Sequence, residues 1–418
     1  MSLALAADGI GLPRSATVCV CVVTKRFMGT DGTGLVACGL EGDATMLGGT
    51  KGNPVVDLCS LDVACARWDL LEAGVAKKIH PVEEPGLRRS EDLASARAMR
   101  FHVLLAVRDE ADIVDQCLRN QLTWADAIHV FDTGSLDETW EIVLQVASED
   151  KRIIPLAKDS VFFSEKRLRG WMFHRARRRM RDGDWFLRAD ADEFHHISPR
   201  EFVRTRMRPH ETVAYHQYYD FHLTVPEVQD WEQGRETLAD RGRSIEERRR
   251  WFTVGPYSEP RLCRYRATMQ WPETVSFPYN AGYLAVKRLP IRHYPHRDPV
   301  QLDRRCRLRA LMMNEPENAC NRHWNQANWN SLIRPSGTPL QYWKPGTELP
   351  EPQFTNHLAP WPRRVAQRAL HAWLLALMDR FRTGYSMAAY PRCIPVDLKN
   401  RLAAELSGNT GVWQASFG

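Results

Sequence analysis

Apolar and polar stretches alternate regularly between residues 98 and 200, and their spacing predicts strands that alternate with helices. Four short runs rich in β-branched and aromatic residues are typical of strands: 100–107, 127–132, 152–157 and 184–190. The segments between them repeat apolar residues at helical spacing: 110–125, 135–147 and 166–181. Strands and helices in this order favour a mostly parallel, Rossmann-like sheet with helices on both faces. The sequence therefore predicts an α/β fold.

The pattern weakens outside this region. Residues 1–97 are dense in Gly and show one strand-like run, so we treat them as an N-terminal extension of uncertain structure. Residues 210–290 are aromatic and β-rich, with a charged helix or loop inserted near 230–250. Helical patterns follow at 300–313 and 361–384. We therefore expect three parts: the extension, a ligand-binding domain over 98–300, and a mainly helical C-terminal region over 301–418.

Acidic residues follow three of the four strands. "VRDE" (107–110) follows the first, "DTGSLD" (132–137) the second and "DADE" (190–193) the fourth. Because the carboxyl ends of parallel strands share one edge, where ligands bind, these segments predict one site. Carboxylates so close together repel one another unless a cation lies among them. A divalent metal is the simplest such cation, and a solvated acidic turn is the alternative.

The residue types in these segments suit a diphosphate ligand. The adjacent phosphates of a nucleotide-diphosphate donor need Mn²⁺ or Mg²⁺ to neutralise them. Asp190 and Asp192, spaced D-x-D, can hold such an ion and leave room for waters and phosphate oxygens. Asp132, beside the flexible Gly134, is placed to accept hydrogen bonds from a base or a ribose.

With these segments in this order, the chain resembles the family 2 glycosyltransferases of GT-A fold, in which D-x-S-x-D and a later D-x-D recur. "IRHYPHRDPVQLDRR" (291–305) also resembles the HYP-x-R-S-x-x-Q element of one bacterial branch, with Asp298 where Ser is usual. The resemblance covers about residues 98–310. It implies a GT-A catalytic domain that binds a nucleotide-sugar donor. It also implies transfer of the sugar, with inversion, to a glycan or lipid-linked acceptor.

The resemblance implies roles for individual residues. Those beside the nucleotide are Arg108, Glu110, Asp132 and Asp190. The residues at the metal, Mn²⁺ or Mg²⁺, are Asp190, Asp192 and His293. An inverting reaction also needs a base that takes the acceptor's proton. The nearest match for this base is Glu273 in "QWPETVSF", and Asp220 in "YYDFHL" is the second choice.

Several residues near these motifs also have structural explanations. The S-x-x-E pattern at 135–138 fits a helix capping box, which would make Ser135 and Asp137 capping residues rather than catalytic ones. His293 could equally be a core histidine at a strand end. His195 and His196 follow the acids, but no zinc-like spacing with other His or Cys accompanies them.

Composition and charge narrow the class of protein. The chain has 418 residues and a net charge of +6. Its Arg-rich stretches 174–181 and 243–251 carry no nucleic-acid motif, so we interpret them as solvated helix faces and expect no nucleic-acid partner. Ten cysteines without a CxxC pair favour a reducing compartment. No apolar run approaches the ~18–20 residues of a membrane span. We expect a cytoplasmic protein whose amphipathic segment 361–382 packs on the catalytic domain or contacts the inner face of the membrane peripherally.

Three other classes of protein can carry clustered acids of this kind. A phosphohydrolase would place its D-x-D after the first core strand, whereas three strand patterns precede residue 190 here. A nucleotidyltransferase generally has a Gly-rich, Lys-containing loop after its first strand, and "AVRDEADI" has neither feature. An inactive GT-A-like binding or scaffold protein would keep the fold without turnover.

Overall fold

The computed structural model describes residues 99–407 apart from 165, 280, 314–328, 336 and 352–387, and within the last gap it describes five single positions (365, 369, 370, 373 and 376). The expected N-terminal extension therefore lies outside the described residues, as does most of the expected helix at 361–384. The chain divides into two units, Met1–Arg88 and Arg89–Gly418, and the fold below is that of the second unit.

Four parallel strands form one half of the sheet and confirm the four strands that the sequence predicts. They are β1 (Phe101–Val107), β2 (Ala127–Asp132), β3 (Ile153–Lys158) and β4 (Trp185–Asp190). Their order is β3-β2-β1-β4, so β1 lies between β2 and β4. All seven residues of β1 are buried, as expected for a strand covered on both faces.

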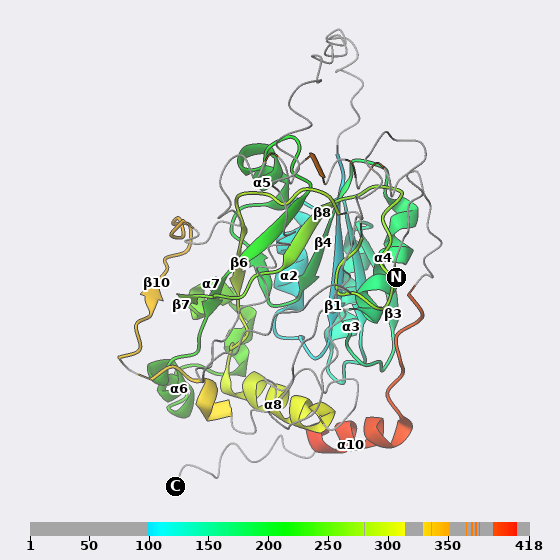
Figure 1. The fold of residues 1–418 in the computed structure, drawn as a ribbon. Coiled ribbons are helices and arrows are strands. Elements are labelled where there is room, and N and C mark those ends of the chain that lie inside the picture. Colours follow the sequence, from blue (N-terminus) through cyan, green and yellow to red (C-terminus); the bar gives the residue numbers. More distant parts are fainter. Residues whose placement is uncertain are drawn as a thin grey trace, which may run out of the picture. The chain divides into compact units, whose positions relative to one another are not determined.

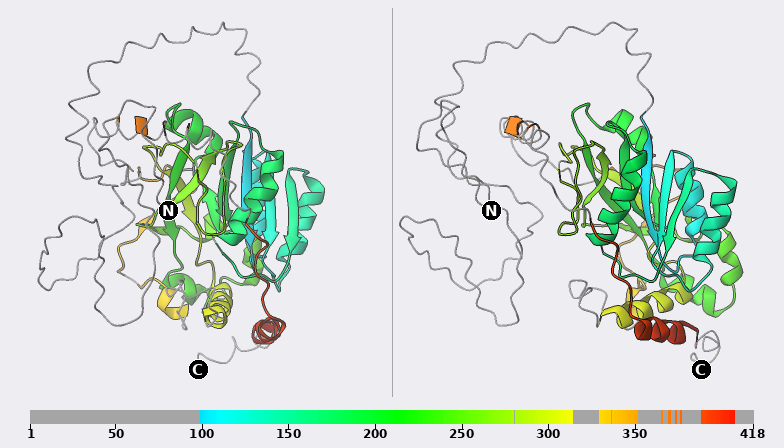
Figure 2. Two further views of the ribbon diagram at one scale, coloured as in Figure 1. Left: turned by 45° about the vertical axis from the view of Figure 1, so that its right-hand side comes forward. Right: turned by 90° about the vertical axis from the view of Figure 1, so that its right-hand side faces the viewer.

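Helices cover both faces of these strands, which confirms the expected α/β class (Figure 2). Val103 and Leu105 of β1 share a hydrophobic core with α2 (Val114–Leu122) and α3 (Thr139–Glu149). Leu104 and Ala106 point to the opposite face and pack in a second core with α4 (Arg167–Ala176). The helix at 166–181 ends in the short 3-10 turn η1 (Arg177–Arg179).

The second half of the sheet is mixed rather than parallel. Its strands are β8 (Pro260–Arg264), β6 (Val213–Phe221), β7 (Trp251–Val254) and β10 (Gln341–Tyr342), which continue outward from β4 in this order, all antiparallel to their neighbours. A short strand, β5 (Glu193–His195), pairs with β9 (Leu289–His293), and β9 runs parallel to β6. Strand β5 follows β4 almost directly, so the residues after Asp190 turn toward β9 and β6.

The remaining helices lie around this sheet. They are α5 (Pro199–Arg206), α6 (Val225–Glu232), η2 (Leu238–Gly242), α7 (Ile245–Arg248), α8 (Pro299–Met313), η5 (Trp329–Leu332) and α10 (Val396–Ser407). The charged insertion near 230–250, for which the sequence leaves a helix or a loop open, contains the short helices η2 and α7 joined by turns. Helices α8 and α10 lie side by side at one end of the sheet (Figure 1), and Met312 shares a hydrophobic cluster with Leu398 and Leu402.

Asp298 fixes the start of α8. This carboxylate is fully buried, and its Oδ1 accepts a hydrogen bond from the backbone N–H of Gln301 at 2.9 Å. Arg241 binds both carboxylate oxygens, at 2.8 and 3.0 Å, and Arg248 lies 3.5 Å from Oδ2. A serine, usual at this place in the HYP-x-R-S-x-x-Q element, could supply the cap but not the ion pairs.

Removing the Asp298 carboxylate should destabilise the fold. In Asp298→Ala, and nearly as much in Asp298→Ser, Arg241 loses its carboxylate partner and the buried Arg248 keeps only Glu236, so we expect a loss of about 3 kcal/mol. Asp303→Ala on the same helix removes only an i,i+4 pair with Arg307 and should cost less than about 1 kcal/mol. Urea unfolding measures the three free energies. Equal losses in Asp298→Ala and Asp303→Ala would show that Asp298 does not anchor α8.

Candidate functional site

The three acidic segments lie at one edge of the sheet. In the pairing register, Val107 is opposite Asp132 on one side of β1, and Ala106 is opposite Asp190 on the other side. Because the strands are parallel, their carboxyl ends point to the same edge. Segments that are far apart in the sequence therefore meet around the end of β1.

Asp132 holds the turn after β2. Its Oδ1 accepts hydrogen bonds from the backbone N–H groups of Gly134 and Ser135, at 2.8 and 2.6 Å. Gly134 has a φ of 100°, and a Cβ there would lie 2.7 Å from the Cα of Ser160, so only glycine fits. The Oδ2 of Asp132 is buried without a hydrogen-bond partner, and burial raises the pKa of this carboxyl. Arg108 donates to the carbonyl of Thr133 at 3.2 Å.

The expected capping box at 135–138 is wrong. Helix α3 starts at Thr139, and Glu138 forms no side-chain cap. The Ser135 hydroxyl instead accepts a hydrogen bond from the backbone N–H of Asp109 at 2.9 Å. Asp109 has a φ of 53°, a left-handed conformation uncommon outside glycine. Asp137 does act at the helix start, because its Oδ1 accepts from the Thr139 N–H at 3.0 Å.

Asp192, His293 and Asp220 form a connected group. The Nδ1 of His293 lies 2.7 Å from Asp220 Oδ1, and its Nε2 lies 3.5 Å from Asp192 Oδ2. The ring stacks on Tyr218 at 4.5 Å between centroids. Burial opposes protonation, but the two carboxylates raise the pKa of His293 to about 10. The sequence-predicted residues Asp192, Asp220 and His293 therefore lie together, with His293 as a cation.

Two arginines also approach Asp192. The Arg305 Nη1 of α8 lies 3.4 Å from Asp192 Oδ2, and the Arg297 Nη1 lies 4.0 Å away. Burial works against the charged carboxylate, yet His293, Arg305 and Arg297 hold the pKa of Asp192 well below its ordinary value. The protein itself thus supplies cations to the carboxylate that the resemblance assigns to the metal.

A buried network of ion pairs and hydrogen bonds surrounds Asp190. Arg169 is fully buried and forms an ion pair with Asp190, while Arg261 of β8 lies 3.6 Å from Asp190 and 2.8 Å from Glu193. The Tyr218 hydroxyl donates to Glu193. Burial, helped by Asp190, raises the pKa of Glu193 to about 7. Burial opposes the ionised form of Asp190 too, but Arg169 and Arg261 lower its pKa.

Glu110 is held by Arg297. This arginine is fully buried, pairs with Glu110 and binds Asp112 with its Nε at 2.6 Å. Burial raises the pKa of Glu110 to about 8, with a further contribution from Asp192. The expected nucleotide-side residue Glu110 therefore sits next to the Asp192 group.

Glu273 is not brought into this group. Within the described part of the chain, its carboxylate pairs with Arg167 at 3.2 Å and accepts from the Ala389 N–H at 3.4 Å. Neither His195 nor His196 joins it either. His195 packs edge-on against Trp124, and burial lowers its pKa to about 3; His196 pairs with the exposed Glu348.

Sequence reasoning missed the arginines of the site. Arg261, Arg297 and Arg305 each contact an acid from another element. Arg297 stands at the Arg position of the HYP-x-R-S-x-x-Q element, so this motif was a usable signal for it. Arg261 in "PRLCR" lies in an ordinary strand pattern, which carries no such signal.

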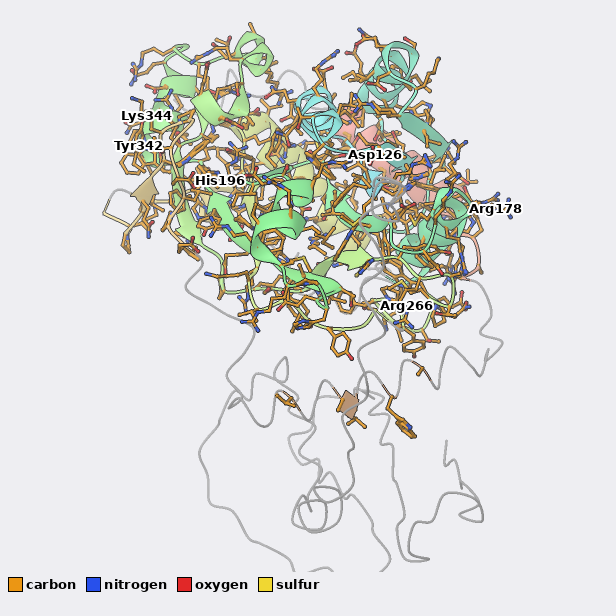
Figure 3. The ribbon with its side chains drawn as sticks, turned by 90° about the horizontal axis from the view of Figure 1, so that it is seen from above. Asp126, Arg178, His196, Arg266, Tyr342 and Lys344 are labelled. Atoms are coloured by element: carbon orange, nitrogen blue, oxygen red, sulfur yellow. The ribbon has the colours of Figure 1, made fainter. Side chains whose placement is uncertain are left out.

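A polar cavity of about 670 Å³ lies beside α5 and β9. It is lined by residues that include His196, Glu246, Arg292 and Trp343. Arg292 and His293 are adjacent on β9, so their side chains point to opposite faces of the strand. Figure 3 shows His196 on the same side of the molecule as Tyr342 and Lys344 and away from Arg178. None of the residues that line this cavity is one of the strand-end acids.

Comparisons with known proteins give only distant likenesses. No protein family and no curated protein matches the sequence. Among solved structures, the mannosyltransferase from Pyrobaculum calidifontis in complex with GDP-Man and Mn²⁺ is 12% identical, with a TM-score of 0.29, over 77% of this chain and 89% of that one. Glucosyl-3-phosphoglycerate synthase from Mycobacterium tuberculosis, in complex with Mn²⁺ and UDP, is 16% identical, with a TM-score of 0.22. That match covers 44% of this chain and 63% of the synthase, less than two thirds of its length. Likenesses this distant do not assign a function to this chain.

The ionisation of His293 should make stability depend on pH. Its pKa is about 10 in the folded protein and about 6.5 when unfolded, so its contribution is fully present below about pH 6.5 and is lost as pH rises toward 10. The difference in unfolding free energy between the wild type and His293→Gln, measured by urea unfolding in EDTA, should therefore be larger at about pH 6 than at about pH 9. A difference that is constant over this range would show that His293 is neutral in the fold.

Proposed function

We propose that this chain is a nucleotide-sugar-dependent glycosyltransferase. The observation that supports this most is the register of the parallel strands, which aligns Asp132 and Asp190 on either side of β1. Asp192, Asp220 and His293 join this edge from the second half of the sheet. A crevice at strand carboxyl ends is where open α/β sheets bind nucleotides. In this proposal Arg108, Glu110 and Asp132 lie on the nucleoside side.

The donor set fits a divalent metal that arrives with the diphosphate. Among the described residues no group of three or more His, Cys, Asp or Glu could hold a metal by itself. Mn²⁺ and Mg²⁺ commonly use one or two carboxylates and take their other ligands from phosphates and water. Asp192 and the partly exposed Asp190 would hold the ion, which would supply charge neutralisation on the leaving diphosphate. His293, 3.5 Å from Asp192 and 2.7 Å from Asp220, would orient Asp192, and its expected role as a metal ligand stays a prediction.

Asp220 is the better candidate for the catalytic base. It is one-quarter exposed and bound to His293, whereas Glu273 pairs with Arg167. In the proposed inverting step, the acceptor oxygen bonds to the anomeric carbon as the bond from that carbon to the diphosphate oxygen breaks. The acceptor's proton passes to the Asp220 carboxylate. His293, held between two carboxylates, fixes the position of Asp220.

The acceptor in this proposal is a glycan or a lipid-linked glycan, and contact with a membrane surface would be peripheral. None of the helices in the described segments has the length and apolar character needed to cross a bilayer. We propose a cytoplasmic location, because the ten cysteines form no CxxC pair and the sequence has no apolar run of membrane-spanning length.

Donor turnover tests the proposed activity. A panel of nucleotide sugars is incubated with the protein, with Mn²⁺ or with EDTA. We expect metal-dependent release of a nucleoside diphosphate, and Asp192→Asn should lower the rate at least about 100-fold, while Asp150→Asn, an exposed pair with Arg152, should not change it. Circular dichroism checks that both variants are folded. Release of free phosphate would indicate a hydrolase. The absence of turnover with any nucleotide sugar would indicate a binding protein.

A paired substitution tests the choice of base. Asp220→Asn should lower kcat by about 10²–10⁴-fold, because an amide cannot take the proton from the hydroxyl of the sugar acceptor. Glu273→Gln should stay within a few-fold of the wild type. Donor affinity, measured separately by calorimetry, should change little in either variant. The reverse order of effects would assign the base to Glu273.

A further inference from the structure

Helix α4 and the turn η1 carry a row of cations on the side that faces away from the sheet. Leu168, Met172 and Phe173 point inward and belong to the second hydrophobic core. Arg175 and Arg178 are exposed, and residues three positions apart lie on the same side of a helix. Figure 3 shows Arg178 at the outer edge of the described side chains. One side of α4 is therefore apolar and the other is basic.

Four exposed arginines make up what we call the basic face. They are Arg175, Arg178, Arg179 and Arg181. In the part of the chain that the structure describes, no carboxylate forms an ion pair with the last three. An exposed arginine elsewhere can be neutralised on the spot, as Arg119 is by Asp115 at 3.0 Å. The basic face instead presents positive charge to solvent, and such a surface attracts an anionic partner.

Two aromatic side chains border the basic face. The guanidinium carbon of Arg175 lies over the Trp171 ring, 4.9 Å from its centroid. Trp171 in turn meets Tyr390 edge to face, with 5.2 Å between centroids. Tyr390 is 39% exposed, and its hydroxyl donates to Asp159 at 3.1 Å. Trp and Tyr beside cations are typical of surfaces that contact lipid headgroups, because each ring has an apolar body and a polar end.

We propose that the basic face docks on a membrane surface that contains anionic lipids. Guanidinium groups form bidentate hydrogen bonds with phosphate oxygens, and clusters of about four to eight cations are typical of segments that bind anionic lipids. No nucleic-acid motif accompanies these arginines, so a membrane fits them better than a nucleic acid. The inference deepens the peripheral membrane contact of the proposed function and rests on that part of it.

Helix α4 links the basic face to the candidate site. It follows β3 in the chain, so its first turn lies at the edge where the parallel strands end. Its inner side supplies Arg169, which pairs with Asp190. A bilayer against the basic face would therefore lie about 10 Å, one helix diameter, from the sheet that carries the strand-end acids. A lipid-linked acceptor would reach the site while its lipid stays in the membrane.

Cosedimentation with lipid vesicles tests this docking. The vesicles contain phosphatidylcholine alone or phosphatidylcholine with phosphatidylglycerol, and no nucleotide sugar is added. We expect the wild type to bind only the vesicles with phosphatidylglycerol and to be released as the salt concentration rises. The double variant Arg178→Glu/Arg179→Glu should bind them at least about tenfold more weakly.

A second double variant, Arg204→Glu/Arg208→Glu, is the matched control. Both arginines are exposed, and the change in net charge is the same. They lie in and just after α5, whose Phe202 belongs to the first hydrophobic core rather than to the core of α4. We expect this variant to bind vesicles like the wild type. Circular dichroism checks that both double variants are folded.

Four other results would each overturn the inference. They are no binding of the wild type to anionic vesicles, unchanged binding of Arg178→Glu/Arg179→Glu, equal weakening in both double variants, and tighter binding of the basic face to duplex DNA than to vesicles. Equal weakening would mean that net charge alone matters, and the DNA result would assign the basic face to a nucleic acid. Vesicle binding is measured without a donor, so its failure leaves the turnover test of the proposed transferase intact. Absence of turnover with normal vesicle binding would reject the transferase and leave the docking surface standing.

Discussion

The pairing of buried carboxylates with buried arginines is the constraint on which this structure depends. Arg169, Arg188 and Arg297 are among its largest fully buried side chains. A buried charge without a partner costs several kcal/mol, so each of these groups must be matched. Arg169 is matched by Asp190, Arg188 by Glu259, and Arg297 by Glu110 and Asp112. Arginines from α4, β4 and the segment after β9 therefore form ion pairs with acids at the strand ends.

The same pairing separates the acidities of neighbouring carboxyl groups. Asp192 has three cationic groups within 4.0 Å, those of His293, Arg305 and Arg297, and its pKa lies well below the ordinary value. Glu193 and Glu110 are buried beside other carboxylates, and their pKa values rise to about 7 and about 8. Environments that push the pKa values of adjacent groups apart are typical of sites that carry out proton transfer or bind charged ligands. At neutral pH the edge thus holds both a firmly ionised acid and acids that can exchange protons.

Local sequence patterns predicted the part of the fold that depends on periodicity. The four parallel strands follow from runs such as "FHVLLAV", because a strand covered on both faces is largely apolar. The helices α2, α3 and α4 follow from apolar residues at helical spacing. The meeting of the acids at one edge follows from the same parallel arrangement. The capping box that the sequence predicts does not form, because the Ser135 hydroxyl accepts a hydrogen bond from the backbone N–H of Asp109. Residue spacing along the chain does not reveal this contact.

The cations of the site were also beyond local patterns, and this changes how the acids are understood. The closely spaced acids in "DADE" repel one another and suggest that a cation lies among them. From the sequence alone, a bound metal is the simplest such cation. The folded protein brings Arg261, Arg297 and Arg305 to them from distant segments. Deleting the Asp192 carboxylate would therefore not relieve repulsion between acids. It would leave His293 and two arginines without their shared partner, so a substitution that keeps the shape of the side chain is needed to separate its chemical role from its structural one. A site whose charges are already balanced without ligand is also preorganised, because the carboxylates need little rearrangement when a diphosphate and its metal bind.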